Sequence, residues 1–284
     1  MSNMTDTGDM DFANHFDSMS TTFLKSANLI MRHSYIHDED SCSVKDSEEI
    51  KDILDRHGKK MAHFFVGLAR LSPYTVKKNA LTVEIGPMRL EVKRTAKGTS
   101  LKLSSTRQTD AAIKKAFSLC TLVVSEDQKA DVKEFRARLG FSEECIRKAS
   151  HECEAQMDDD IFAKGSSALR CLMNRVKENA VNGRALSEAE TQRLVKEVGK
   201  CWARWLIALI EMSSATLKDG AIEVKLGSLT ISLSGHAAKL QLSFKFTGSV
   251  EKELKAYFAP HLELEKTEPL TSDEVKAKIN ASKK

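Results

Sequence analysis

A repeat inside the chain constrains its fold more than any other feature of the sequence. When the 284-residue chain is shifted by 141 positions, residues 53–92 align with residues 194–233 without a gap, and ten of the forty pairs are identical. The identical pairs are Gly58/Gly199, Lys59/Lys200, Ala62/Ala203, Leu68/Leu209, Ser72/Ser213, Thr75/Thr216, Lys77/Lys218, Ala80/Ala221, Val83/Val224 and Gly86/Gly227. Self-similarity at a fixed offset predicts two diverged copies of one structural module.

The apolar residues show which elements this module contains. Over residues 47–71 and 187–212 they recur at a spacing of three to four, which predicts a long amphipathic helix in each copy. Further along they alternate with polar residues, which predicts strands with one buried face. In copy one the alternating sets are Leu81, Val83 and Ile85, then Met88, Leu90 and Val92, then Leu101 and Leu103. We align the last two with Leu240 and Leu242, past a two-residue deletion.

The remaining helices complete the expected module. A first helix is predicted at about 12–34 and 161–178, and a closing helix at about 110–119 and 250–258. Ser187 and Glu190 have the spacing of a capping box at the start of the second helix in copy two. The only tryptophans, Trp202 and Trp205, lie on the apolar side of that helix, so we expect them in the core.

The sequence therefore predicts an α+β fold made by tandem duplication of a helix-helix-three-stranded antiparallel sheet-helix module. The expected parts are a flexible acidic N-terminus (1–11), copy one (12–120), a helical connector (121–157), copy two (158–265) and a C-terminal tail with a short helix (266–284). We expect each sheet to pack on its own long second helix. A pseudo-two-fold axis should relate the copies, because a duplicated homodimer keeps its self-complementary contact.

Composition and charge exclude several classes of protein. The formal net charge is only +4, so overall charge alone would not drive binding to nucleic acid or to an acidic membrane. No apolar run approaches the roughly 18 residues of a membrane span, and the acidic, polar start lacks the pattern of a signal peptide. The six cysteines are scattered without CxxC pairs, which is typical of a reducing compartment. We expect a soluble cytoplasmic protein with no membrane partner.

The sequence contains none of the familiar catalytic or phosphate-binding motifs. His33 and His37, followed by carboxylates, have a spacing that could hold a divalent metal, but a polar helix end explains them as well. Cys145 and Cys153, with His151 between them, have the wrong spacing for a zinc knuckle. We therefore expect no catalytic residues, no cofactor and no metal site, and interpret the chain as a non-enzyme.

The two sheets differ most in charge. Residues 77–115 carry ten basic and three acidic residues, a net charge of +7, whereas residues 218–256 carry six and four, a net charge of +2. Copy two instead has Thr230, Ser232, Ser234 and Ser243 at the polar strand positions. The candidate binding residues for nucleic acid or an acidic partner are Arg89, Lys93, Arg94, Lys97, Lys102 and Arg107.

Two functions remain open at this point. The lack of a site motif and the divergence of the polar faces favour a protein-interaction or assembly subunit, which binds a protein partner or self-associates. The alternative is a nucleic-acid-binding protein that uses the basic sheet face of copy one. Against the alternative, no aromatic residue lies between Tyr74 and Phe117 to stack on bases.

Overall fold

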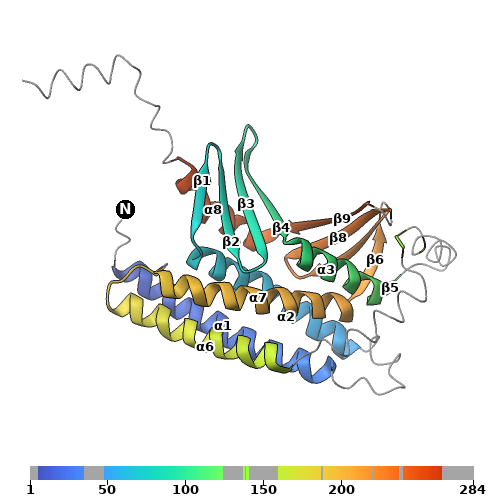
Figure 1. The fold of residues 1–284 in the computed structure, drawn as a ribbon, viewed down its shortest axis with the longest axis horizontal. Coiled ribbons are helices and arrows are strands. Elements are labelled where there is room, and N and C mark those ends of the chain that lie inside the picture. Colours follow the sequence, from blue (N-terminus) through green and yellow to red (C-terminus); the bar gives the residue numbers. More distant parts are fainter. Residues whose placement is uncertain are drawn as a thin grey trace, which may run out of the picture.

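The computed structural model describes residues 6–34, 48–123, 137, 139–140, 159–186, 188–218, 220–236 and 239–263 (Figure 1). The N-terminal half contains α1 (Asp6–Ser34), α2 (Glu48–Leu71), β1 (Tyr74–Lys77), β2 (Ala80–Ile85), β3 (Met88–Thr95), β4 (Gly98–Ser105), α3 (Arg107–Leu119) and β5 (Thr121–Val123). The C-terminal half contains α6 (Asp159–Val181), α7 (Ala189–Met212), β6 (Ser214–Lys218), β7 (Ala221–Leu226), β8 (Leu229–His236), β9 (Lys239–Phe246) and α8 (Gly248–Glu263). The fold is α+β, as the sequence predicts.

Each half forms an antiparallel meander of four strands, one more than the three we expected. The additional strands are β1 and β6, which follow directly after the long helices. The sequence did not reveal β1 because it is short and its Val76 is the only partly buried residue. In the second sheet, β5 of the N-terminal half pairs in parallel with β6.

The two halves keep the 141-residue offset further than the sequence alignment indicated. The bounds of α7, β7, β8 and β9 all lie 141 positions after those of α2, β2, β3 and β4. The strand register also contradicts the two-residue deletion, since Leu101 lies opposite Val92 and Leu242 lies opposite Leu233. The equivalent of Leu101 is therefore Leu242.

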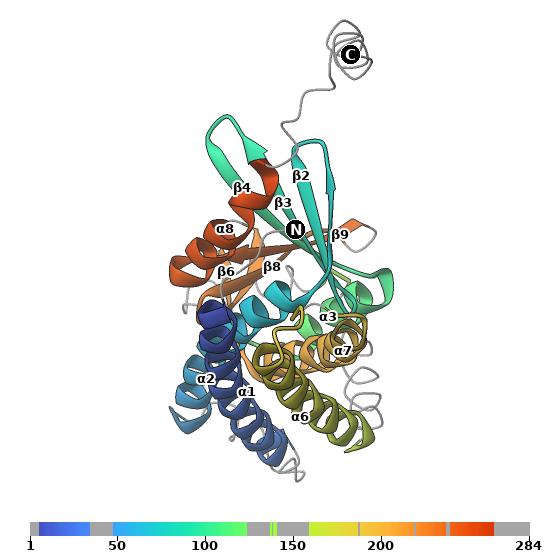
Figure 2. The same cartoon turned by 90° about the vertical axis from the view of Figure 1, so that its left-hand side faces the viewer.

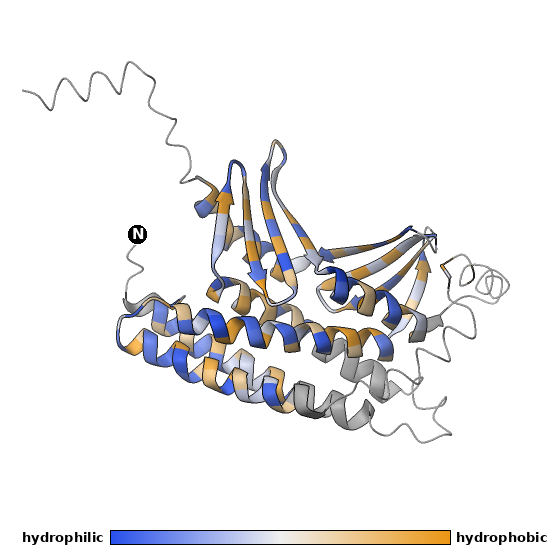
Figure 3. Cartoon of the chain, viewed as in Figure 1, coloured by the Kyte–Doolittle hydropathy of each residue, from blue (hydrophilic) through white to orange (hydrophobic). Residues whose placement is uncertain are grey.

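The elements form three layers, seen in two orientations in Figures 1 and 2. Helices α1 and α6 pack side by side as the outer layer, α2 and α7 pack above them, and the two sheets lie on the other side of α2 and α7. Polar and apolar residues alternate along the strands (Figure 3), as expected of sheets with one buried face. No helix in the described part of the chain is long and apolar enough to cross a bilayer.

The halves exchange their packing partners. Helix α2 packs on β7 and β8 of the other half, α7 packs on β2, and α8 covers β2, β3 and β4. Helix α2 also touches its own β2, but the packing of α2 on β7 and β8 and of α7 on β2 contradicts the expectation that each sheet packs on its own second helix. The buried residues of both halves form one continuous hydrophobic cluster.

Paired glycines permit this exchange. A Cβ atom at Gly199 of α7 would lie 2.7 Å from the backbone nitrogen of Gly86, in the β2–β3 turn. At the equivalent place, a Cβ atom at Gly58 of α2 would lie 2.7 Å from the carbonyl carbon of Leu226, beside Gly227 in the β7–β8 turn. Gly86 and Gly227 have φ values of 57° and 58°, which residues with a side chain rarely adopt. Each hairpin turn thus rests directly on the backbone of the other half's helix.

Equivalent positions also meet at the centre of the molecule. The Trp202 indole Nε1 donates a hydrogen bond of 3.1 Å to the carbonyl oxygen of Met61, and these residues lie 141 positions apart. The Phe65 ring packs on Trp202 at 4.7 Å and on Phe246 at 5.4 Å between centroids. Trp202 and Trp205 are buried, which confirms the expectation that they belong to the core.

Ser187, the first residue of the predicted capping box at the start of α7, lies outside the described residues. The N-cap residue is Glu188, which makes no side-chain capping hydrogen bond. The carboxylate of Glu190 pairs instead with Arg175 of α6. The Glu190 carboxylate thus joins α6 to α7, a contact that local spacing alone does not reveal.

The shared core predicts the effect of two substitutions. Phe65 and Leu206 are fully buried at equivalent positions, so Phe65→Ala and Leu206→Ala should each lower the free energy of unfolding by about 2–5 kcal/mol. Val181→Ala, at a side chain that is 68% exposed, is the control and should have little effect. Urea melts should give one cooperative transition in each case. Two separate transitions, only one of which responds to each change, would contradict a shared core.

The glycine contacts predict that alanine at these two helix positions lowers stability, although such a change usually raises it. Replacing glycine by alanine inside a helix normally stabilises a protein by up to about 1 kcal/mol. At Gly58 and Gly199 the added methyl group would meet backbone atoms, so each alanine variant should lose about 1–3 kcal/mol. Thermal melts that show a gain in stability at either position would mean that turn and helix are not in contact.

Candidate functional site

The structure separates the six basic residues that the sequence singled out. Arg89, Lys93 and Lys102 share the outer face of the first sheet, as their alternation with buried residues predicts. Arg94 has the opposite orientation along β3, and Lys97 lies in the β3–β4 turn. Arg107 is the first residue of α3. All six side chains are exposed, but only three of them lie on one surface.

Carboxylates interrupt this basic face. Glu91 lies between Arg89 and Lys93 on β3 and opposite Lys102 on β4. The Lys93 ammonium is 2.7 Å from the Glu91 carboxylate. Its hydrogen bond, with the charges of Lys102 and Arg89, holds the pKa of Glu91 below the ordinary value. The carboxylate is therefore ionised at neutral pH and offsets part of the positive charge.

The outer faces of the two sheets differ less than the residue counts indicated. The first face carries four basic and two acidic strand residues, namely Lys77, Arg89, Lys93, Lys102, Glu84 and Glu91. The second carries four basic residues and one acidic residue, namely Lys218, Lys225, Lys239, Lys245 and Glu223. The excess charge of residues 77–115 lies in turns and on α3. The charged strand residues thus give the two outer faces similar net charges, +2 on the first and +3 on the second.

A concentration of positive charge does occur in a groove between the halves. The groove has a volume of about 950 Å³ and is bounded by the β2–β3 turn and α3 of one half and by α6 and α7 of the other. Five basic residues and one acidic residue line it, namely Lys115, Lys164, Lys196, Lys200, Arg204 and Glu197. Small residues lie among them, including Ala112, Gly165, Ala168 and Ala203. We call this feature the cationic groove.

Three of the basic residues belong to one helix. Lys196, Lys200 and Arg204 recur every four residues along α7, which places them in a row on one face. The Lys200 ammonium lies 2.8 Å from the Glu197 carboxylate. Within the described part of the chain, neither Lys196 nor Arg204 forms an ion pair. The row therefore presents more positive charge to the groove than its own helix neutralises.

The start of α3 forms the opposite wall. Thr106 is its N-cap, and the hydroxyl oxygen accepts a hydrogen bond of 3.5 Å from the backbone N–H of Thr109. Thr106, Gln108 and Thr109 all line the groove. The positive end of the α3 dipole therefore lies at the groove, as the basic side chains do. Both walls of the groove thus favour an anionic group.

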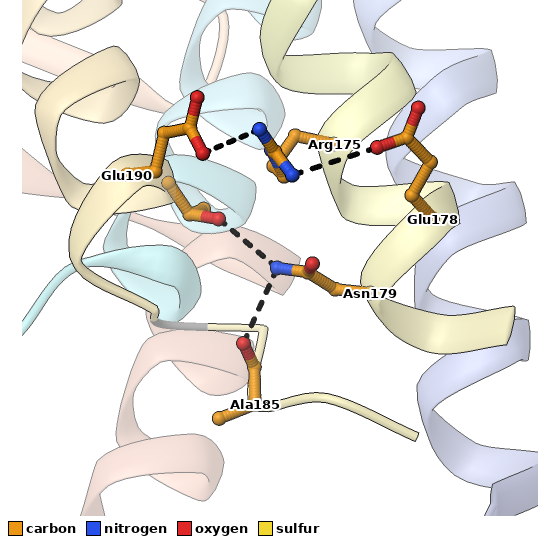
Figure 4. Close-up of polar contacts among 6 residues, drawn as sticks. Arg175, Glu178, Asn179, Ala185 and Glu190 are labelled. Carbon is orange, nitrogen blue, oxygen red and sulfur yellow. Dashed lines mark hydrogen bonds and ion pairs between the residues drawn. The ribbon is translucent and has the colours of Figure 1, made fainter. Parts of the chain in front are cut away.

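A polar network holds α6 against α7 and so fixes the remaining wall (Figure 4). Arg175 of α6 pairs with Glu190 of α7 and lies 3.6 Å from Glu178. The buried Asn179 side chain donates through Nδ2 to the carbonyl oxygen of Ala185 at 3.3 Å and to the Thr191 hydroxyl at 3.2 Å. These contacts fix the turn between the two helices. They hold α6 and α7 together, and both helices carry residues that line the groove.

Cys201 lies in the groove but is a poor nucleophile. Burial raises the pKa of its thiol to about 11, and the nearby Glu197 adds to this effect. The thiolate, which is the reactive form, is therefore scarce at neutral pH. The thiol sulfur also lies against Gly165 of α6, where an added Cβ atom would collide with it. Cys201 acts as a small packing residue between α6 and α7.

The equivalent place in the other half is bridged by side chains. Ser249 Oγ lies 3.4 Å from His63 Nε2, and His63 Nδ1 lies 3.8 Å from a Glu253 carboxylate oxygen. The order resembles that of a nucleophile, a base and an orienting acid. Both separations exceed the range of about 2.6–3.2 Å for such a site, and His63 and Glu253 are 38% and 50% exposed. We assign these residues the structural role of joining α8 to α2.

No group of three His, Cys, Asp or Glu residues suited to a metal ion occurs in the described part of the chain. The His33–His37 cluster and the Cys145–Cys153 pair fall outside the residues whose side chains are described, as does most of the connector 121–157. Of the cysteines that are described, Cys120, Cys171 and Cys201 are free thiols.

Sequence reasoning missed the cationic groove because its walls come from both halves. One signal was present, namely the basic residues at 196, 200 and 204, whose spacing indicates one face of a helix. A count restricted to the strand regions excluded this helix.

Comparison with known proteins gives no match. No protein-family model matches the chain, nor does any curated protein or solved structure. The function proposed below therefore rests on the residues, geometry and charges of this chain.

The burial of Cys201 leads to a testable outcome. In the folded protein at pH 8, iodoacetamide should alkylate the exposed Cys171 and leave Cys201 and Cys120 unmodified, because their thiols are buried. Peptide mass spectrometry measures the modification at each site. In urea all three should react alike, which is the control. Alkylation of native Cys201 as fast as Cys171 would contradict the packing role and reopen a chemical one.

Proposed function

We propose that this chain is a non-catalytic protein-interaction or assembly protein that binds an acidic segment of a protein partner in the cationic groove. The observation that carries this proposal is the ratio of five basic residues to one acidic residue around a single groove. Complementary charge speeds association and selects partners. An acidic polypeptide is the simplest complement to such a lining.

The lining favours a protein segment over nucleic acid. Ala112, Ala168 and Ala203 provide an apolar floor, which suits the mixed polar and apolar character of a peptide. None of the groove residues is aromatic, whereas sites for single-stranded nucleic acid combine basic residues with aromatic stacking platforms. Carboxylates on the outer face of the first sheet, at Glu84 and Glu91, also weaken the case for a phosphate-binding surface there.

We further propose that the two halves derive from duplication of one module with the order helix-helix-four strands-helix. The constant offset of 141 between the bounds of α2–β4 and α7–β9 supports this. The reciprocal contacts of Gly58 with the turn at Gly227 and of Gly199 with the turn at Gly86 also support it. A contact that recurs with exchanged partners is what a former two-fold dimer interface would leave. On this view the groove is a place where the copies diverged.

Charge reversal tests the binding proposal. Lys196→Glu combined with Arg204→Glu should weaken binding of fluorescent poly-L-glutamate by about tenfold or more at low salt, because two groove charges change sign. The matched control is Arg89→Glu with Lys102→Glu, which changes the same total charge on the outer sheet face. The control should bind within about twofold of the unchanged protein. Fluorescence anisotropy measures both, and circular dichroism checks folding.

Two results would contradict the proposal. Equal loss of binding in both pairs of variants would mean that net charge matters and the groove does not. Stronger binding to a 20-nucleotide single-stranded DNA than to poly-L-glutamate, lost with the outer-face pair, would instead favour the nucleic-acid alternative.

A further inference from the structure

The shape of the cationic groove carries information about its occupant beyond the sign of its charge. Its long walls are helices α3, α6 and α7, and only the β2–β3 turn and the start of α3 contribute non-helical backbone. Backbone amides and carbonyls within a helix are already hydrogen-bonded to each other. An extended peptide binds chiefly by adding a strand to a free sheet edge, and this groove offers no such edge.

The row of basic residues on α7 matches the repeat of a second helix. Lys196, Lys200 and Arg204 follow one another at intervals of about 6 Å along the axis, and the whole row spans about 12 Å. Carboxylates placed four residues apart on a helix lying alongside α7 would repeat at the same interval. Each basic residue could then face one acidic residue.

The volume of the groove agrees with this length. A helix is about 10 Å in diameter, so a segment about 12 Å long would fill a volume like that of the groove, about 950 Å³. That length corresponds to roughly two turns. Small residues at the floor, Ala112, Ala168 and Ala203, let the axis of such a helix approach closely.

Basic residues on the other walls extend the pattern. Lys115 belongs to α3 and Lys164 to α6, so positive charge flanks the apolar floor on more than one side. An occupant that suits this arrangement has a narrow apolar stripe of small or medium side chains. Acidic residues border the stripe, with one row spaced four residues apart.

From these features we infer that the groove binds an acidic amphipathic α-helix of about two turns, seated alongside α7. This inference rests on the proposed function and specifies its partner. The helix lays its apolar stripe on the alanine floor, and its row of carboxylates faces Lys196, Lys200 and Arg204.

Selection from a displayed library of random 16-residue peptides tests the inference with the full-length protein as bait. Bound peptides should be enriched in Glu or Asp at positions i, i+4 and i+8 with apolar residues between them. The best peptide, labelled with ¹³C, should show helical Cα chemical shifts when bound. A proline at its centre should weaken binding by at least about tenfold, because proline disrupts a helix interior.

Two variants of the protein locate the site. Ala112→Trp places a large side chain on the groove floor without a change of charge, and should abolish binding of the selected peptide. Ala256→Trp, at an exposed position on α8, is the matched control and should leave binding unchanged. The combination of Lys196→Glu with Arg204→Glu should also abolish binding. Thermal melts establish that each variant is folded.

The possible failures can be told apart. Acidic peptides that depend on Lys196 and Arg204, but lack the four-residue spacing and tolerate proline, would overturn the helical occupant and leave the proposed function standing. A selection that yields no acidic peptides, or peptides unaffected by changes in the groove, would overturn both. Tight binding of a 20-nucleotide single-stranded DNA that depends on the groove residues, without selected acidic peptides, would also overturn both.

Discussion

The contact between hairpin turns and helix backbones determines how this molecule is built. Gly86 lies against Gly199, and Gly227 lies against the segment of α2 that begins at Gly58. Without Cβ atoms at these places, each turn reaches the helix backbone of the opposite half. Sheets placed in this way present their buried faces to helices from both halves. The single core follows, with the Trp202–Met61 hydrogen bond at its centre.

The cationic groove is a direct consequence of that arrangement. The turn that carries Gly86 also supplies Pro87 to the groove lining, and the same contact brings α3 against α7. Without α3 and the β2–β3 turn of the other half, only α6 would flank the row of basic residues on α7. A surface assembled from two halves can gain charge on one side without any change to the core, since its charged residues lie on the outer faces of helices whose other faces are buried.

Local patterns in the sequence predicted most of the helices and strands but not which of them pack together. Period-2 alternation identified β2 and β3, and the helical spacing identified α2 and α7 to within two residues at each end. Strand β1 was not predicted, because a strand with one partly buried residue shows no alternation of apolar and polar residues. The exchange of packing partners was not predicted, because an apolar stripe indicates that one face of a helix is buried but not which sheet covers it. The groove was not predicted for the same reason. The identical glycine pairs could be seen in the sequence, but the sequence does not show which backbone each glycine contacts.

The row of like charges on α7 is the strongest argument that the groove has a function. Like charges four residues apart on a helix destabilise it, by about 0.2–0.5 kcal/mol per pair. Lys196 and Lys200 form one such pair, and Lys200 and Arg204 form another. At the equivalent positions of α2 the sequence has Asp55, Lys59 and His63, so the row of three basic residues is not repeated there. The basic row is thus slightly unfavourable for the fold, and the acidic partner proposed above would offset this cost.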